Sequence, residues 1–220
     1  MSKLVIAIDG PAGAGKSTVA KILAKRLDLS YLDTGAMYRA LALAAKRTGL
    51  GPADAERIAE LGHKIEIDFG HGEPQPVLLN GEDVTSAIRT PEMGEMASAI
   101  SAHSAVRKVM VERQQELVQH GGYTLEGRDV TTVVAPHADV KVYLTASLEE
   151  RAKRRYVEME NKGIGHGDFE DVRQQIEGRD HRDITREDSP LKVAEGAMIV
   201  ETGGLGIEEV VNRILALVPH

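Results

Sequence analysis

Apolar residues at the start of the chain first run together and then recur at helical spacing. Residues 4–8 form a nearly continuous apolar run, which is typical of a buried strand. After a glycine-rich stretch, Val19, Leu23 and Leu27 recur four positions apart, and this spacing predicts a helix. Residues 29–32 then have the pattern of a short second strand. The chain is therefore expected to open with a strand–helix–strand unit.

A change of period marks the middle of the chain. We expect a helix over residues 36–46 and another from Pro52, because proline is favoured in a first helical turn. Apolar and charged residues then alternate over 65–69, as in a half-buried strand. Asn80 and Gly81 both adopt positive φ easily, which favours a hairpin turn. A small antiparallel element is thus predicted as an insertion.

The second half of the chain returns to alternating helices and strands. Helices are predicted over residues 91–100, 104–120 and 210–218. Strands are predicted over residues 123–126, 139–145 and 197–201. This alternation favours an α/β fold, in which helices cover both faces of a parallel sheet and ligands bind at the carboxyl ends of its strands.

An arginine-rich helix–loop–helix lies between the last two predicted strands. Ser147 and Glu150 form the pattern of a capping box that starts the first helix. The glycine-rich residues 163–167 interrupt it, and Asp168 can cap a second helix that runs to about residue 182. A helical pair joined by glycines is a candidate mobile lid.

Composition excludes several functional classes. The 220 residues are 42% hydrophobic and 28% charged, and their longest apolar runs are too short for a membrane span. Without cysteine the chain forms no disulfide or thiolate metal site. A formal net charge of −7 argues against binding to a nucleic-acid polymer or an anionic membrane. The early first strand leaves no room for a leader peptide, so we expect a cytoplasmic protein.

The stretch between the first strand and the first helix matches G-x-x-x-x-G-K-[ST], and that strand–helix context is the one in which this motif binds phosphate. Its backbone N–H groups can surround a polyphosphate, while Lys16 adds positive charge and the Ser17 hydroxyl can bind Mg²⁺. The helix N-terminus also favours an anion. The expected phosphate-binding residues are Gly10, Pro11, Ala12, Gly13, Ala14, Gly15, Lys16, Ser17 and Thr18.

Three further polar clusters, residues 33–39, 127–129 and 179–186, follow predicted strands or end the predicted lid. In the first cluster, the Arg39 guanidinium could bind a phosphate through two parallel hydrogen bonds. Taken singly, the clusters could equally be a helix start, a loop ion pair and a solvated ion pair between Arg179 and Asp183. As a set they favour a phosphate-handling site, which needs several cations.

The glycine-rich loop and the runs 33–39, 126–129 and 179–186, in this order, resemble the bacterial cytidylate kinases. The resemblance extends over essentially the whole chain and includes the inserted sheet element. It implies a P-loop kinase that transfers the γ-phosphoryl group of MgATP to CMP or dCMP, with ATP and Mg²⁺ as co-substrate and cofactor. The acceptor phosphate is already largely ionised near neutral pH, so no general base is required.

The resemblance also implies roles for individual residues. The residues expected to bind the CMP phosphate, cytosine and ribose are, in chain order, Thr34, Tyr38, Arg39, Ser98, Arg107, Arg128, Asp129, Arg179 and Asp183. Those expected to neutralise the transferred phosphoryl group are Lys16, Arg128, Arg151, Arg154, Arg155 and Arg186. The implied division is a core of residues 1–62, 101–150 and 183–220, a nucleoside monophosphate-binding insertion of 63–100, and a lid of 151–182.

Other functions remain open at this point. A related kinase could act on UMP, AMP or an alcohol, and an alcohol would need a base such as Asp33 or Asp129. A GTP-hydrolysing switch would normally carry an Asn-Lys-x-Asp motif, which this sequence lacks. A P-loop scaffold without catalysis is the third alternative. We expect a monomer whose partners are the small nucleotides CMP, dCMP and ATP.

Overall fold

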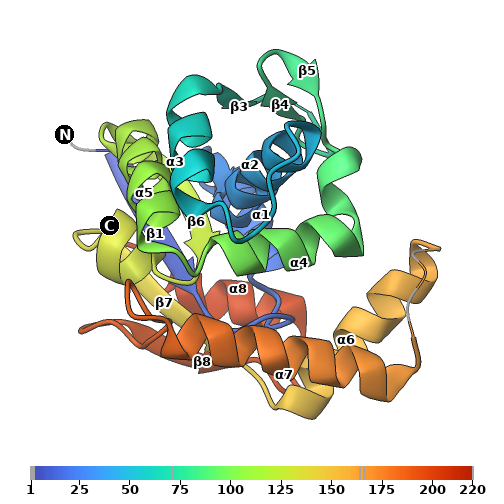
Figure 1. The fold of residues 1–220 in the computed structure, drawn as a ribbon. Coiled ribbons are helices and arrows are strands. Elements are labelled where there is room, and N and C mark those ends of the chain that lie inside the picture. Colours follow the sequence, from blue (N-terminus) through green and yellow to red (C-terminus); the bar gives the residue numbers. More distant parts are fainter. Residues whose placement is uncertain (1–2, 71, 164, 166, 220) are drawn as a thin grey trace. The chain divides into compact units, whose positions relative to one another are not determined.

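The computed structural model describes residues 3–70, 72–163, 165 and 167–219, and these form two compact units (Figure 1). One unit comprises Met1–Asp33 and Gln115–His220, and the other comprises Thr34–Gln114. Each unit has a sheet of its own. The division into core, insertion and lid concerns function and stays a prediction.

The first unit contains a five-stranded parallel sheet in the order β2-β6-β1-β7-β8. Its strands are β1 (Lys3–Asp9), β2 (Ser30–Asp33), β6 (Gly121–Gly127), β7 (Val140–Thr145) and β8 (Met198–Glu201). Asp9 pairs with Gly127 on one side and with Tyr143 on the other. The carboxyl ends of the three central strands therefore meet at one edge, where ligands are expected in such sheets.

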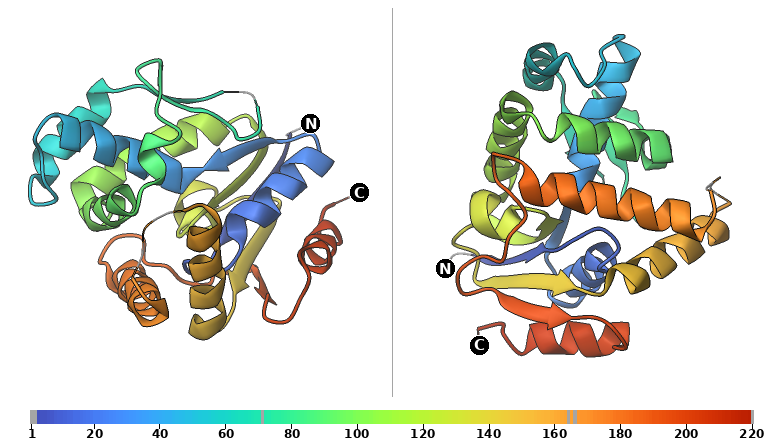
Figure 2. Two further views of the ribbon diagram at one scale, coloured as in Figure 1. Left: turned by 90° about the vertical axis from the view of Figure 1, so that its right-hand side faces the viewer. Right: turned by 60° about the horizontal axis from the view of Figure 1, so that its bottom comes forward.

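The helices of this unit are α1 (Lys16–Arg26), α6 (Leu148–Asn161), α7 (Phe169–Thr185) and α8 (Ile207–Leu215). Side chains of α1 and α8 bury a common core against β1, β7 and β8, with Leu23 and Ile214 fully enclosed. α6 and α7 lie side by side, as both views of Figure 2 show, and share a second apolar cluster. The parallel sheet with flanking helices confirms the predicted α/β class.

The second unit is built around α2 (Thr34–Arg47), ten of whose residues are buried. This burial suits its run of alanine and leucine. The remaining elements are α3 (Ala55–Lys64), β3 (Ile67–Phe69), β4 (Val77–Leu79), β5 (Glu82–Asp83), the 3-10 helix η1 (Ala87–Arg89), α4 (Pro91–Ile100) and most of α5 (Ser104–Val118). β3, β4 and β5 form the predicted small antiparallel sheet.

Some predicted boundaries were wrong, and one element was not predicted. α3 begins at Ala55 and not near Pro52, because Asp54 accepts a hydrogen bond from the Gly51 N–H and holds a turn there. Gly121 and Gly122 do not end α5 but begin β6. The segment after β6 forms a short π-helix, η2 (Val130–Val134), which no periodicity of the sequence indicated.

Both predicted helix starts around the glycine break are observed. The Ser147 hydroxyl accepts from the Glu150 N–H at the start of α6. Asp168 and Asp171 form a complete capping box at the start of α7. Two residues of the predicted break between them, Ile164 and His166, lie outside the described residues.

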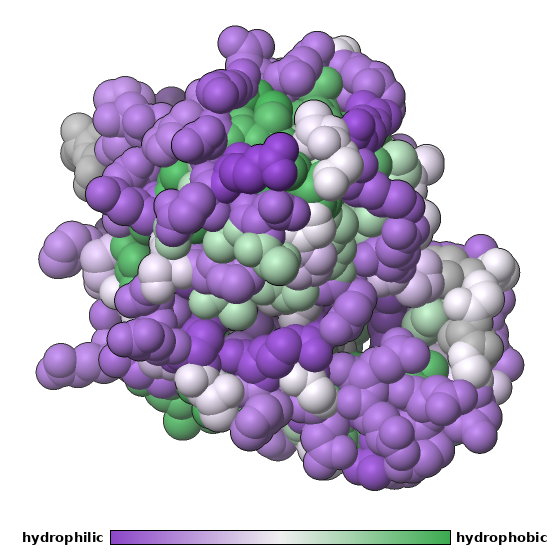
Figure 3. Space-filling view, in the orientation of Figure 1, coloured by the Kyte–Doolittle hydropathy of each residue, from purple (hydrophilic) through white to green (hydrophobic). Residues whose placement is uncertain are grey.

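The surface of the α6–α7 pair is mainly hydrophilic in the space-filling view of Figure 3. Within the described part of the chain, no helix has the length and apolar character needed to cross a membrane.

Replacing Gly81 with alanine should destabilise the protein by about 1 kcal/mol, because φ at this turn position is +80° and an L side chain resists that conformation. Space is not the obstacle, since an added Cβ would meet no atom within 4 Å. Urea unfolding measures the change.

Gly178→Ala is the matched control. Gly178 lies inside α7 with the same open space around an added Cβ, so alanine there should stabilise by up to about 1 kcal/mol. Equal effects of the two substitutions would contradict the assigned backbone conformations.

Candidate functional site

The phosphate-binding loop leaves β1 through a backbone turn that only glycine allows. Gly10 has φ +149°, and a Cβ built on it would lie 2.0 Å from the carbonyl oxygen of Leu144 in β7. Gly13 has φ +76°, and its Cβ would lie 2.8 Å from the carbonyl oxygen of Arg151. The loop is thus pressed against β7 and α6, and its glycines are needed for space as well as for conformation.

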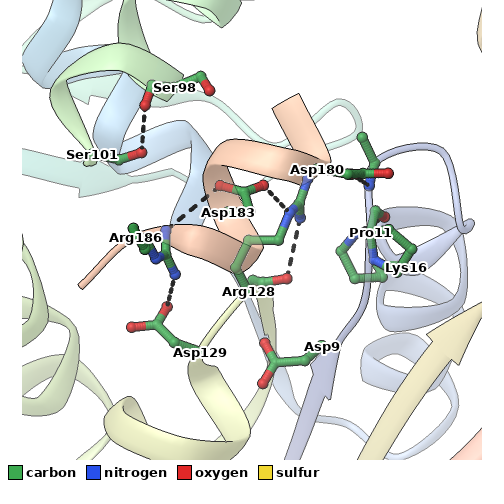
Figure 4. A network of polar contacts seen from close by, with 12 residues as sticks. Asp9, Pro11, Lys16, Ser98, Ser101, Arg128, Asp129, Asp180, Asp183 and Arg186 are labelled. Atoms are coloured by element: carbon green, nitrogen blue, oxygen red, sulfur yellow. Dashed lines mark hydrogen bonds and ion pairs between the residues drawn. The ribbon is translucent and has the colours of Figure 1, made fainter. Parts of the chain in front are cut away.

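Lys16 begins α1 at the end of this loop and is buried. Its Nζ donates to the carbonyl oxygen of Pro11 at 2.7 Å (Figure 4). Burial, followed by the positive charge of Arg128, lowers the pKa of Lys16 to about 7, although Glu126 opposes the shift. A bound phosphate would counter both causes, so the site is prepared to attract an anion.

Asp9, the last residue of β1, anchors the segment that follows β6. Its Oδ1 accepts from the Val130 N–H at 2.9 Å, and its Oδ2 accepts from the Thr131 N–H at 2.8 Å and the Thr131 hydroxyl at 2.5 Å. Burial raises the pKa of Asp9 to about 6, even though these hydrogen bonds favour the charged form. Asp9 therefore ties the base of the loop to the residues directly after Arg128 and Asp129.

Cations and carboxylates alternate at the carboxyl edge of the sheet, as Figure 4 shows. Arg128 Nε donates to Asp183 Oδ2 at 2.9 Å. Arg186 lies 3.6 Å from Asp183 and 3.8 Å from Asp129. Burial alone raises the pKa of Asp183, but Arg128, Arg179 and Arg186 together bring it below its usual range. Four predicted site residues are thereby brought together in one cluster, two directly after β6 and two at the end of α7.

The predicted lid arginines have different environments. Arg151 is buried and donates to the backbone oxygens of Ala12 and Ala146. Arg154 donates to the hydroxyl and the carbonyl oxygen of Thr202, each at 2.8 Å. Arg155 pairs with Glu158 at 3.0 Å and remains about 30% exposed. The three residues share a helix, but they do not converge on one point.

The predicted acceptor-binding residues before position 115 lie in the second unit. Arg107 is buried, donates to the Ser101 carbonyl oxygen at 3.2 Å, and stacks its guanidinium 5.8 Å from the Tyr38 ring centre. The Ser98 carbonyl oxygen accepts from the hydroxyl of Ser101, the residue that caps the C-terminal end of α4.

The other two predicted residues of this unit belong to α2. Arg39 donates to the Ile88 carbonyl oxygen at 3.3 Å. Thr34 is the first residue of α2, because β2 runs directly into the helix.

Ser17 is exposed in the first turn of α1, where its hydroxyl could reach a metal bound to the phosphates. A hydroxyl oxygen combined with phosphate oxygens is a donor set that Mg²⁺ accepts. The residues present therefore fit the predicted metal.

Sequence reasoning missed three residues that hold this site. In the sequence, Asp9 is only a charged residue at the end of an apolar strand. Asp180 is one of several charged residues in the run 179–186. Thr202 has no local signal at all, because its partner Arg154 is 48 residues away. Each acts through contacts that depend on the tertiary fold.

Comparison with known proteins decides the family. The model of the cytidylate kinase family matches residues 6–220. The cytidylate kinase of Listeria welshimeri is 50% identical over 98% of this chain and 96% of its own length. That of Bacillus cereus strain ATCC 10987 is 47% identical with the same coverage. The chain belongs to the cytidylate kinase family.

Membership in the family confirms the predicted class of enzyme, a nucleotide-binding kinase, and favours it over a switch or an inactive scaffold. Among solved structures, the shikimate kinase of Bacteroides thetaiotaomicron aligns over 97% of both chains with a TM-score of 0.50 and 13% identity. This likeness concerns the fold alone.

The raised pKa of Asp9 predicts a specific pH dependence of stability. The folded-state pKa of about 6 exceeds the unfolded value of 3.8, so the folded state binds the proton more tightly and gains stability as pH falls through 6. Relative to an Asp9→Asn variant, the protein should gain about 2 kcal/mol between pH 7.5 and pH 4.5. Urea unfolding at both pH values measures the difference.

Asp139→Asn serves as the matched variant, because the exposed Asp139 carboxylate also accepts a backbone hydrogen bond of the sheet, from Val5. It shows what loss of a carboxylate bonded to a backbone amide does by itself. A pH-independent difference between the protein and the Asp9→Asn variant would contradict the burial of Asp9 as a costly charge.

Proposed function

We propose that the chain transfers the γ-phosphoryl group of MgATP to CMP or dCMP and yields ADP with CDP or dCDP. The observation that carries the proposal is the cluster of Arg128, Asp183 and Arg186 at the same sheet edge as the phosphate-binding loop, in a member of the cytidylate kinase family. An anion-binding loop and a separate group of buried cations suit two phosphorylated substrates.

The loop and the start of α1 would bind the phosphates of ATP. Backbone N–H groups of the loop supply hydrogen bonds, the dipole of α1 adds positive potential, and Lys16 gives a mobile charge. The charged Lys16 Nζ donates one of its three N–H groups to the Pro11 carbonyl oxygen, which leaves the others for a phosphate. A bound Mg²⁺, held by Ser17 and the phosphates, would neutralise part of the charge on the transferred group.

The acceptor would be held by the residues that the family resemblance assigns to it. We assign the CMP phosphate to Thr34, Tyr38, Arg39 and Arg128, and the cytosine to Ser98, Arg107 and Asp129. Arg179 and Asp183 would contact the ribose. Because buried polar groups left unpaired by the wrong base cost several kcal/mol at most, these contacts would give selectivity without editing.

The chemistry needs positioning and charge more than a base. The second pKa of a phosphate monoester is about 6, so the attacking oxygen is largely ionised at neutral pH. The barrier arises from repulsion between two anions and from charge on the phosphoryl group in flight. Lys16, Arg128 and Arg186 would stabilise that charge from buried positions, where electrostatic effects are strong.

The α6–α7 pair would act as the lid that excludes water, which otherwise competes as an acceptor. Arg155, whose side chain is about 30% exposed and pairs with Glu158, suits a contact made only on closure. We further expect the enzyme to act as a cytoplasmic monomer on free nucleotides.

The first test is ADP formation from MgATP with CMP, dCMP, UMP, AMP, GMP, shikimate or no acceptor at equal concentrations. We expect the fastest turnover with CMP or dCMP and at least about 100-fold less without acceptor, since base recognition and water exclusion both depend on the acceptor site. Lys16→Ala should lower turnover by orders of magnitude while the fold persists.

Faster turnover with an alcohol such as shikimate would refute the assignment and point to Asp33 or Asp129 as a base. Equal ADP formation with and without any acceptor would instead indicate an ATPase and remove the acceptor site.

The lowered pKa of Lys16 predicts that ATP binding takes up a proton. Free Lys16 has a pKa of about 7, and bound phosphates raise it, so the complex holds more protons than the free enzyme above that pH. Affinity for MgATP should therefore fall as pH rises from about 7 to 8.5. Calorimetry in buffers with different ionisation heats measures the uptake directly.

A Lys16→Met variant, studied at ATP concentrations that saturate it, should lose this uptake. Undiminished proton uptake by the variant would show that another group titrates on binding.

A further inference from the structure

Both peptide groups of Ala12, in the middle of the phosphate-binding loop, are bonded by side chains of the α6–α7 pair. The Ala12 N–H donates to Asp180 Oδ1 at 2.9 Å, and the Ala12 carbonyl oxygen accepts from Arg151 Nη1 at 3.0 Å. These partners are 168 and 139 residues away along the chain. Figure 4 shows Asp180 of α7 beside the loop at Pro11 and Lys16.

Arg151 and Asp180 also bind each other, so the three residues form a closed ring. Arg151 Nη1 donates to Asp180 Oδ2, and Arg151 Nε donates to the Ala146 carbonyl oxygen at 2.9 Å. The exposed fractions of the two side chains are only 9% and 10%. A buried ion pair of this kind is costly to break, because removing one partner leaves the other charge uncompensated.

The side chain of Ala12 enters the apolar core of the same helix pair. Its methyl group belongs to the buried cluster formed with Ala152, Met159, Val172 and Ile176. The next loop residue, Gly13, has no room for a Cβ because the Arg151 backbone is in contact with it. Hydrogen bonds, an ion pair and apolar packing therefore all fix the loop to the first turn of α6 and the later part of α7.

This geometry bears on the role expected for Arg151. Its Nε and Nη1 atoms are used on Ala146, Ala12 and Asp180. Moving this guanidinium to reach a phosphate would break a buried ion pair and the bonds that shape the loop, so only its Nη2 group could contact one from the present position. Arg155, with a part-exposed side chain on the same helix, has no such constraint.

We propose that Arg151 and Asp180 are positioning residues that hold the phosphate-binding loop through the peptide groups of Ala12 and so preorganise it for ATP. The inference rests on the proposed function in one respect, namely that this loop receives the phosphates of ATP. It assigns Arg151 an action through the loop instead of a contact with the transferred phosphoryl group. Movement of the lid would then be confined to the parts of α6 and α7 beyond this anchor.

A double-mutant cycle on MgATP binding tests the proposal, with Arg151→Met, Asp180→Asn and the double variant. Each single substitution breaks the same ring, so each should raise the Kd for MgATP about 10-fold. Calorimetry without acceptor measures this Kd. The double variant should bind within about 2-fold of the weaker single variant, because nothing remains to be lost. Its melting temperature should exceed that of the less stable single variant, since no buried charge is left unpaired.

Arg173→Met is the matched control, because Arg173 lies on α7 in exposed ion pairs with Glu170 and Glu177. It removes one arginine of the helix pair and should leave the Kd for MgATP unchanged. An equal loss of affinity in this variant would overturn the specific role of Arg151.

Hydrogen exchange at the Ala12 amide keeps the test decisive if a variant is unstable. In the nucleotide-free protein this amide should be protected, and Asp180→Leu, which removes the acceptor oxygen that Asn would keep, should speed its exchange at least about 10-fold relative to the loop's neighbours. Unchanged exchange would refute the anchor. The exchange result does not depend on any transfer to CMP, so failure of the proposed function would leave it readable.

The proposal would also be overturned if the Kd of the double variant rose by the product of the two single increases. The same holds if Arg151→Met loses turnover at saturating ATP while Asp180→Asn behaves like the unmodified protein. Either pattern would place Arg151 on the phosphates, independent of Asp180.

Discussion

Gly10 sets the constraint on which the site depends. A Cβ at this position would lie 2.0 Å from a carbonyl oxygen of β7, so the chain can turn out of β1 here only without a side chain. That turn directs the loop along β7 toward α6, where Ala12 and Gly13 meet the first turn of the helix. Lys16 then begins α1 beneath the loop. The shape of the proposed anion site is thus a consequence of how closely backbone segments pack.

Buried charge is the second organising feature, and most of it is balanced locally. Arg128 and Arg186 share Asp183, while Arg151 pairs with Asp180. Lys16 and Asp9 show the cost of burial most clearly, because their pKa values move toward neutrality. A phosphorylated ligand would relieve the excess of positive charge around Lys16. The site therefore trades stability of the free protein for affinity, as functional sites commonly do.

Much of this could be predicted from the sequence, because local signals carried it. The glycine-rich motif, the capping residues of α6 and α7 and the Asn80-Gly81 turn are short patterns with strong physical causes. Predicted element boundaries were wrong where one residue type is compatible with two structures. Gly121 can end a helix or begin a strand, and the structure uses it for the strand.

The partners of individual charges could not be predicted, for a different reason. Arg151 and Arg154 lie three residues apart on the same helix. Arg151 nevertheless donates to Ala12 of the loop, whereas Arg154 donates to Thr202. The choice depends on contacts 139 and 48 residues away along the chain. Sequence spacing shows which residues share a face but not what lies opposite that face.

In the proposed function, buried cations and a preorganised loop direct a phosphoryl group to a nucleotide acceptor and away from water. Following the label from γ-³²P-ATP in the presence of CMP is the most direct test. We predict that nearly all label released from ATP appears in CDP, with the inorganic phosphate fraction below about one part in a hundred. Label found mainly in inorganic phosphate, or retained on the protein, would contradict it.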